Sequence, residues 1–254
     1  MKSKRVEFKG ALGETLVGRI DKPEGEIKAC ALFAHCFTCS KNLKAVGNIT
    51  KALAQKGVKT LRFDFTGLGE SEGDFADTNF SSNIDDLVAA SEFMASEHHS
   101  PSILIGHSLG GAAVLQASHR IDSAKAVVTI GAPSEPKHVQ RHFESSKREI
   151  EEKGEAVVKL ADRPFKVKKQ FLDDLEETRM DSFIENLGRA LLVMHAPLDE
   201  TVEIQNAAHI YKKAKHPKSF ISLHEADHLL TNEKFSLYSG SLIAAWAEIY
   251  LGKS

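Results

Sequence analysis

The sequence SILIGHSLGGAAVLQA, residues 102–117, decides the fold because it sets a G-x-S-x-G motif between an apolar strand pattern and a helix of small residues. Glycines at 106 and 110 suit a turn that is too tight for flanking side chains. In this strand–turn–helix setting, the motif presents a serine hydroxyl above the edge of a sheet. The helix that begins at Leu109 directs free N–H groups toward that hydroxyl. We therefore take Ser108 as a candidate nucleophile, in preference to an ordinary Gly-Ser turn.

Short apolar runs alternate with helical patterns along the rest of the chain. Eight segments have the pattern of a strand: RVEFKG, ETLVGRI, ALFAH, KTLRFDF, SILIGH, AKAVVTIGAP, RALLVMHAP and KSFISLHEA. The first two predict an antiparallel hairpin around residues 10–13. Helical patterns separate most of the others, which indicates parallel strands joined by right-handed crossovers. We therefore predict an α/β fold with a mostly parallel eight-stranded sheet and helices on both faces.

One charged segment, residues 134–185, interrupts this alternation. Its pattern predicts a helix, then a β-hairpin that turns at residues 162–164, then a second helix. One interpretation is a solvated peripheral excursion, which charge runs usually are. The other is a lid over the C-terminal edge of the sheet, where open α/β folds place their sites. We predict the lid, so that residues 1–133 and 186–254 form the α/β core.

The composition argues against several classes of protein. The 254 residues carry a net charge of −2 and a sequence pI of about 6.6, so there is no basic excess for nucleic acid or an anionic membrane. No stretch approaches the roughly 20 apolar residues of a membrane span. The first ten residues, MKSKRVEFKG, lack the apolar region of a secretion signal. Three cysteines, an odd number, argue against a disulfide scaffold and for a reducing compartment. We expect a cytoplasmic protein.

An acid and a base are needed to activate a serine hydroxyl. The base takes the proton, and the acid orients the base. With this serine motif both follow later strands, the acid before the histidine. Asp199 comes just after the seventh predicted strand and His228 just after the eighth. Glu200 and Asp227 are neighbouring alternatives for the acid, and a helix N-cap is the structural alternative for Asp199. Their order and positions favour Asp199 and His228.

Two motifs point to other chemistry. Residues 224–228, HEADH, match the H-E-x-x-H zinc signature, but that site requires a continuous helix, and here a strand pattern precedes the motif. Residues 67–73, GLGESEG, have their third glycine one position too late for a G-x-G-x-x-G dinucleotide loop. We interpret them as a tight loop in the floor of a pocket. The sequence therefore predicts neither a metal nor a cofactor.

Residues 34–42, AHCFTCSKN, follow the third strand, where this architecture places a loop that stabilises the negative oxygen of a tetrahedral intermediate. We assign one backbone N–H donor to Phe37 in this loop and the other to Leu109, the residue after the serine. For Cys36 and Cys39 three interpretations stay open: small structural residues, a redox-sensitive pair, or metal ligands.

Taken together, these features resemble the α/β-hydrolase superfamily over nearly the whole chain. Four stretches, AHCFTCSKN, LRFDFTGLGESEGDF, GHSLGGAA and AKHPKSFISLHEADHLLT, resemble the hydrolase half of bifunctional proteins that join an α/β-hydrolase to an OsmC-type peroxide-reducing domain. That resemblance implies Ser108, Asp199 and His228 as a catalytic triad, with Phe37 and Leu109 as oxyanion donors. Because the chain stops after the last hydrolase helix, we expect no OsmC-type domain. The DFTGLGESEG loop also resembles small cinnamoyl and feruloyl esterases, which use inserted lids.

We therefore expect a carboxylesterase-like serine hydrolase that cleaves small-molecule carboxylic esters, of short-chain or aryl (cinnamoyl) type, through an acyl-enzyme. Thioesterase, lactonase, peptidase and acyltransferase chemistry fit the same residues. Two hypotheses from other classes are a catalytically silent binding module on the same scaffold and a thiol redox protein that uses Cys36 and Cys39.

Overall fold

A computed structural model describes residues 1–36, 39–97, 99–160 and 163–252. Within them, eight strands form one sheet in the order β1-β2-β4-β3-β5-β6-β9-β10. The strands are β1 (Lys2–Lys9), β2 (Thr15–Lys22), β3 (Ala29–Ala34), β4 (Val58–Phe63), β5 (Ile103–His107), β6 (Ala126–Ile130), β9 (Ala190–His195) and β10 (Lys218–Ser222). β2 is antiparallel to β1 and β4, and all other neighbours are parallel. The predicted α/β fold, with its opening hairpin, is confirmed.

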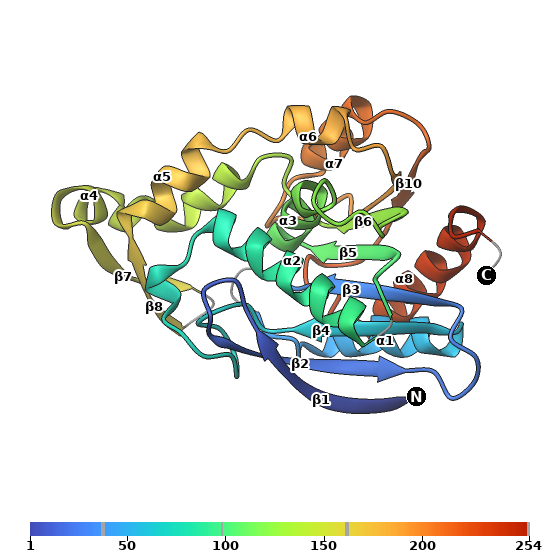
Figure 1. Ribbon diagram of the computed structural model, residues 1–254. Coiled ribbons are helices and arrows are strands. Elements are labelled where there is room, and N and C mark those ends of the chain that lie inside the picture. The colour runs from blue at the N-terminus through green and yellow to red at the C-terminus, as the bar shows by residue number, and fades with distance from the viewer. Residues whose placement is uncertain (37–38, 98, 161–162, 253–254) are drawn as a thin grey trace.

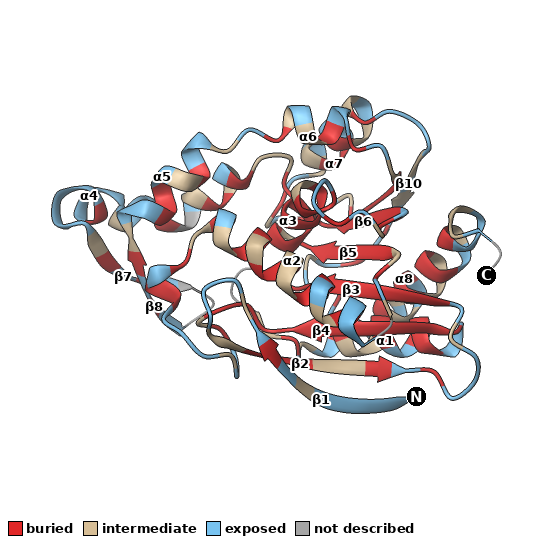
Figure 2. Cartoon of the chain, viewed as in Figure 1, coloured by how far each residue is buried: buried red, intermediate tan, exposed pale blue. Residues whose placement is uncertain are grey.

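Helices cover both faces of this sheet (Figure 1). They are α1 (Lys44–Gln55), α2 (Phe80–Ser96), α3 (Leu109–Ala117), α7 (Ile204–Lys213) and α8 (Glu233–Ala247). Side chains of α1 and α8 pack on one face, and those of α2, α3 and α7 on the other. Neighbouring residues of β3 alternate between these two cores, Leu32 toward α2 and α3, and Phe33 toward α1. The central strands are therefore buried along their whole length, which Figure 2 shows in red.

The segment between β6 and β9 forms its own small unit. It contains the 3₁₀ helix η2 (Pro136–Phe143), α4 (Glu144–Lys153), β7 (Glu155–Leu160), β8 (Arg163–Lys168), α5 (Lys169–Glu177) and α6 (Asp181–Glu185). β7 and β8 pair antiparallel in a separate sheet, as the hairpin prediction expected, although residues 161 and 162 of its turn lie outside the described residues. α4, β7 and β8 lie at the end of the molecule opposite the two termini (Figure 1).

This segment is packed against the core through an aromatic cluster. Phe165 of β8 and Phe171 of α5 lie 5.3 and 5.8 Å, between ring centroids, from Phe75 in the 3₁₀ helix η1 (Phe75–Asp77). The Asp174 carboxylate accepts hydrogen bonds from the backbone N–H and the hydroxyl of Ser81, at 2.9 and 2.6 Å. Aromatic contacts and hydrogen bonds therefore both attach this segment to the core. Among the described residues, no helix is both long and apolar enough to cross a membrane.

Candidate active site

Ser108 lies on the sharp turn that joins β5 to α3. Its backbone has φ 56° and ψ −128°, in the left-handed half of conformational space that side chains disfavour. A Cβ on Gly106 would lie 2.2 Å from the carbonyl oxygen of Gly110, and one on Gly110 would lie 2.5 Å from the carbonyl oxygen of Ala34. Both contacts are with backbone, which cannot give way. The glycines of the motif are therefore required by close packing, as the sequence predicts.

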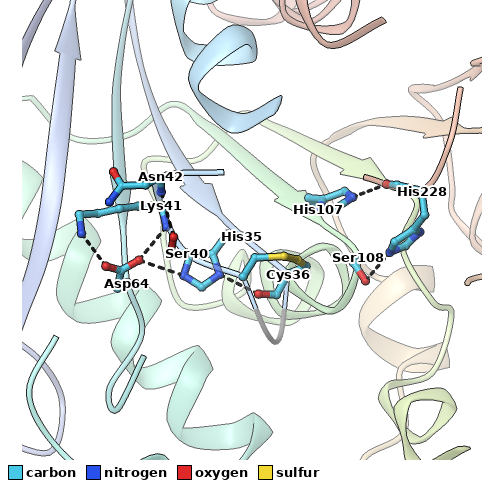
Figure 3. The surroundings of a disulfide bond; sticks show 10 residues. His35, Cys36, Ser40, Lys41, Asn42, Asp64, His107, Ser108 and His228 are labelled. Carbon is cyan, nitrogen blue, oxygen red and sulfur yellow. Dashed lines mark hydrogen bonds and ion pairs between the residues drawn. A yellow bond between two sulfur atoms is a disulfide. The ribbon is translucent and has the colours of Figure 1, made fainter. Parts of the chain in front are cut away.

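The three side chains proposed from the sequence meet at this turn. The Ser108 Oγ lies 3.0 Å from Nε2 of His228 (Figure 3), and Nδ1 of His228 lies 2.7 Å from Oδ2 of Asp199. An ionised carboxylate only accepts hydrogen bonds, so Nδ1–H donates to Asp199, and Nε2 is left to accept from the Ser108 hydroxyl. Asp199 follows β9 and His228 follows β10. This geometry lets a hydroxyl transfer its proton to an oriented imidazole.

The alternative residues from the sequence take other contacts. The Asp227 carboxylate accepts a 2.9 Å hydrogen bond from the backbone N–H of Thr231, and Glu200 is exposed. The H-E-x-x-H stretch forms turns instead of a helix, with Glu225 at φ 64°, so it lacks the geometry of the zinc signature. In the described part of the chain, no three His, Cys, Asp or Glu side chains gather as a metal site requires.

Asp199 stays ionised because hydrogen bonds outweigh the effect of its burial. Burial acts to raise the pKa of this carboxyl, but the bonds from His228, Val202 and Thr201 together hold the pKa below its usual value. The backbone N–H groups of Thr201 and Val202 donate to Oδ1 at 2.9 and 2.8 Å. His195, at the end of β9, lies 3.6 Å from Oδ2 through its Nε2, which also bonds the Val202 carbonyl oxygen at 2.7 Å.

Two residues beside Ser108, Asp199 and His228 were missed by the sequence interpretation. His107, next to the serine, donates from Nε2 to the carbonyl oxygen of His228 at 2.7 Å (Figure 3). A Cβ on Gly131, which has φ 56°, would lie 3.3 Å from both Asp199 Oδ2 and His228 Nδ1. Both residues stand at strand ends on the edge that carries the triad, and this position was the signal available in the sequence.

Residues 35–41 lie between β3 and α1, and we call them the oxyanion loop after the role expected from the sequence. Phe37, the donor expected from the sequence, lies outside the described residues. Leu109, the other expected donor, is the first residue of α3, so its N–H has no acceptor within the helix. Cys36 and Cys39 are joined by a disulfide, with Cα atoms 5.3 Å apart, and Cys30 is free and buried. The odd cysteine count argued against a disulfide framework, and it gave no signal for this short local bond.

Both described ends of the oxyanion loop contact the buried carboxylate of Asp64, which follows β4 (Figure 3). Oδ1 accepts from the backbone N–H of Lys41 at 2.7 Å and lies 3.7 Å from Nε2 of His35. Oδ2 accepts from Lys41 Nζ at 2.5 Å, and that ammonium also bonds Glu70 at 2.8 Å. The bond to Lys41 lowers the pKa of Glu70 to about 2. The fully buried Lys41 is therefore paired with two carboxylates.

Comparison with known proteins agrees with this fold. The serine aminopeptidase S33 family matches residues 25–161, more than half of the chain. None of the curated proteins compared with the chain matches it. A crystal structure of the esterase domain of a Rhodothermus marinus protein is 47% identical, with a TM-score of 0.81 over 99% of this chain and 100% of that one. Est1E from Butyrivibrio proteoclasticus is 18% identical, with a TM-score of 0.79 over 96% and 98%. Its structure with bound ferulic acid is 20% identical, with a TM-score of 0.77 over 96% and 99%.

Proposed function

The chain belongs to the serine aminopeptidase S33 family of α/β-hydrolases, and from that premise we propose that it cleaves carboxylic esters through an acyl-enzyme on Ser108. The observation that carries the proposal is the continuous set of hydrogen bonds from the Ser108 hydroxyl through His228 to Asp199. The 47% identity to an esterase domain over the whole chain supports an esterase-like hydrolase. Peptide cleavage, which the family description names, is the second candidate.

The reaction follows from the hydrogen-bond directions. Ser108 Oγ attacks the ester carbonyl carbon while its proton passes to Nε2 of His228. The imidazolium then gives that proton to the departing alcohol as the carbon–oxygen bond breaks, which leaves the acyl group on Ser108. A water molecule repeats the sequence, and the acid is released. Asp199 keeps the proton on Nδ1 and stabilises the imidazolium throughout.

The negative oxygen of the tetrahedral intermediate needs fixed N–H donors. We assign them to the backbone of Leu109, at the N-terminus of α3, and of Phe37 in the oxyanion loop. What supports the second assignment is the position of the loop. A Cβ on Gly110 would lie 2.6 Å from the carbonyl oxygen of His35, so the start of the loop packs directly on the start of α3.

The substrate proposal is a small-molecule ester with a short or aryl acyl group. Aryl esters are included because the chain shares its fold with Est1E, whose structure holds ferulic acid. We further propose that residues 134–185 act as a lid that limits the size of the acyl group. This is supported by their place between β6 and β9, two strands that end at the edge carrying the serine.

The test is hydrolysis of p-nitrophenyl acetate by the wild type and by Ser108→Ala. We expect turnover in the wild type and none in the variant, with both folded by circular dichroism. A panel of p-nitrophenyl esters of increasing acyl length, with methyl ferulate and an aminoacyl p-nitroanilide added, separates the ester proposals from peptide cleavage. Turnover retained in Ser108→Ala would exclude the nucleophile, and preference for the anilide would exclude an esterase.

A further inference from the structure

We propose that His107 is a positioning residue for the base. Through one hydrogen bond to the backbone of His228, His107 fixes the imidazole of His228 relative to Ser108, the residue that follows His107 in the chain. The inference rests on the proposed function, because it assigns His107 a role in the same reaction. His107 bonds the backbone carbonyl of His228, whereas the two imidazole nitrogens of His228 bond Ser108 and Asp199, so the effect of His107 passes through the position of His228.

The loop that carries His228 is anchored in the core by the buried side chains of Leu223, Ala226 and Leu230. Its residues next to the histidine, Asp227 and Leu229, and the preceding His224 and Glu225 are exposed. Left-handed backbone conformations, which residues other than glycine disfavour, occur on either side of His228, at Glu225 (φ 64°) and Leu230 (φ 51°). Such conformations persist only where surrounding contacts hold them. A loop of this kind needs a fixed point on its inner side.

His107 supplies that fixed point from the end of a buried central strand. It is the last residue of β5, pairs with Ile130 of β6 and is 3% exposed. Its Nε2–H donates to the carbonyl oxygen of His228 at 2.7 Å, across 121 positions of sequence (Figure 3). The two imidazole rings also lie against each other, with centroids 5.1 Å apart. Because Ser108 is the next residue, one backbone segment fixes the nucleophile and the base together.

The charge state of His107 suits this role. Burial, followed by the charge of His228, lowers its pKa to about 3, so the ring is neutral whenever the enzyme is folded near neutral pH. A neutral ring has one N–H, and Nε2 uses it on the His228 carbonyl. A cation at this place would repel the imidazolium that forms during the reaction. A neutral donor can therefore position His228 without opposing its protonation.

The experiment compares His107→Leu, which keeps bulk but has no donor, with His107→Gln, whose amide N–H₂ can reach the same carbonyl. We expect kcat for p-nitrophenyl acetate to fall on the order of 10²-fold in His107→Leu with KM changed less than about threefold, since a misplaced base slows chemistry more than binding. His107→Gln should recover most of kcat. The matched control is His119→Leu, because Nε2 of His119 makes the same kind of bond, 2.9 Å long, to the carbonyl oxygen of Phe183 far from the site.

A second readout does not depend on turnover. The proton on Nδ1 of His228, shared with Asp199, gives a strongly deshielded signal in proton NMR. We expect that signal in the wild type, His107→Gln and His119→Leu, and its broadening or loss in His107→Leu. If His107→Leu does not fold, the shorter His107→Asn, which keeps a polar group but cannot reach the carbonyl, should show the same loss of kcat.

The results separate two failures. If Ser108→Ala retains turnover, the proposed function is wrong. If Ser108→Ala abolishes turnover while His107→Leu or His107→Asn keeps the wild-type kcat and NMR signal, only the role of His107 is wrong. An equal loss of kcat in His107→Leu and His107→Gln would also overturn it, because the hydrogen bond would then not be the feature that matters.

Discussion

At the scale of single residues, Asp199 is held in one orientation by bonds to both of its oxygens. Oδ1 accepts from two backbone N–H groups, and Oδ2 accepts from Nδ1 of His228. Rotation of the carboxylate would break all three bonds. The proton of the imidazole is therefore kept on Nδ1, and Nε2 faces the serine in the form that can accept a proton.

Asp199→Asn should preserve the shape of the site but no longer keep the imidazole proton of His228 on Nδ1. The amide can present an N–H to Nδ1, which favours the wrong tautomer, and we expect kcat for a p-nitrophenyl ester to fall on the order of 10³- to 10⁴-fold. Asp227→Asn is the matched control, since it alters the carboxylate next to His228 in sequence. Comparable losses in both variants would contradict the assignment of Asp199 as the acid.

Buried histidines should make the fold sensitive to acid. Burial lowers the pKa of His35, His107 and His195, that of His107 to about 3. An unfolded histidine binds a proton near pH 6.5, so between that pH and the folded pKa the unfolded state holds more protons and stability falls with falling pH. Each such histidine contributes at most about 1.4 kcal/mol per pH unit.

Urea titrations between pH 6.5 and 4.5 check this. We expect the free energy of unfolding to decrease toward acid pH in the wild type, and to decrease less steeply in His107→Gln because one proton-binding group is gone. Parallel curves for the two proteins would show that His107 takes up its proton in the folded state as readily as in the unfolded state.

At the scale of elements, the oxyanion loop has two independent restraints. The Cys36–Cys39 disulfide closes its middle, and the Asp64 carboxylate accepts hydrogen bonds from the backbone N–H and the Nζ of Lys41 at its end. Asp64 is itself enclosed by the next loop, because a Cβ on Gly69, which has φ 58°, would lie 2.2 Å from its Oδ2. The GLGESEG stretch is therefore a glycine turn wrapped around a buried carboxylate.

Because Asp64 holds the Lys41 end of the loop through two hydrogen bonds, the disulfide should be dispensable for turnover. We expect a double Cys36→Ser/Cys39→Ser variant to keep kcat for p-nitrophenyl acetate within about threefold of the wild type, measured with and without a dithiol reductant. Cys30→Ser, which alters the free cysteine, is the control. Loss of turnover in a folded double variant, or in the reduced wild type, would mean that the disulfide positions the donor.

The lid proposal makes a prediction about α5. Asp174 ties this helix to the start of α2 through Ser81, whereas Asp173 bonds Lys169 within its own helix. Asp174→Ala should loosen the segment and raise kcat/KM for long-chain relative to short-chain esters by at least about threefold. Asp173→Ala should leave that ratio unchanged. If both variants keep the wild-type ratio, residues 134–185 do not limit the acyl group.

At the scale of the whole molecule, the order of the elements could be predicted because parallel strands buried on both faces leave continuous apolar runs, as β3 and β9 do. The meeting of Ser108, Asp199 and His228 was predictable for the same reason, since the ends of parallel strands share one edge. The Lys41–Asp64 ion pair and the His107–His228 hydrogen bond could not be predicted from the sequence. Charged loop residues usually face water, and a backbone contact between residues 121 positions apart leaves no local pattern.

The central claim is that Ser108 is reactive because His228 and Asp199 activate it, and mass spectrometry after fluorophosphonate labelling tests it most directly. We predict one label per chain, on the peptide that contains Ser108, with labelling at least about a hundredfold slower in His228→Gln and unchanged in Asp227→Asn. A label on another residue, or wild-type labelling of Ser108 in His228→Gln, would contradict the claim.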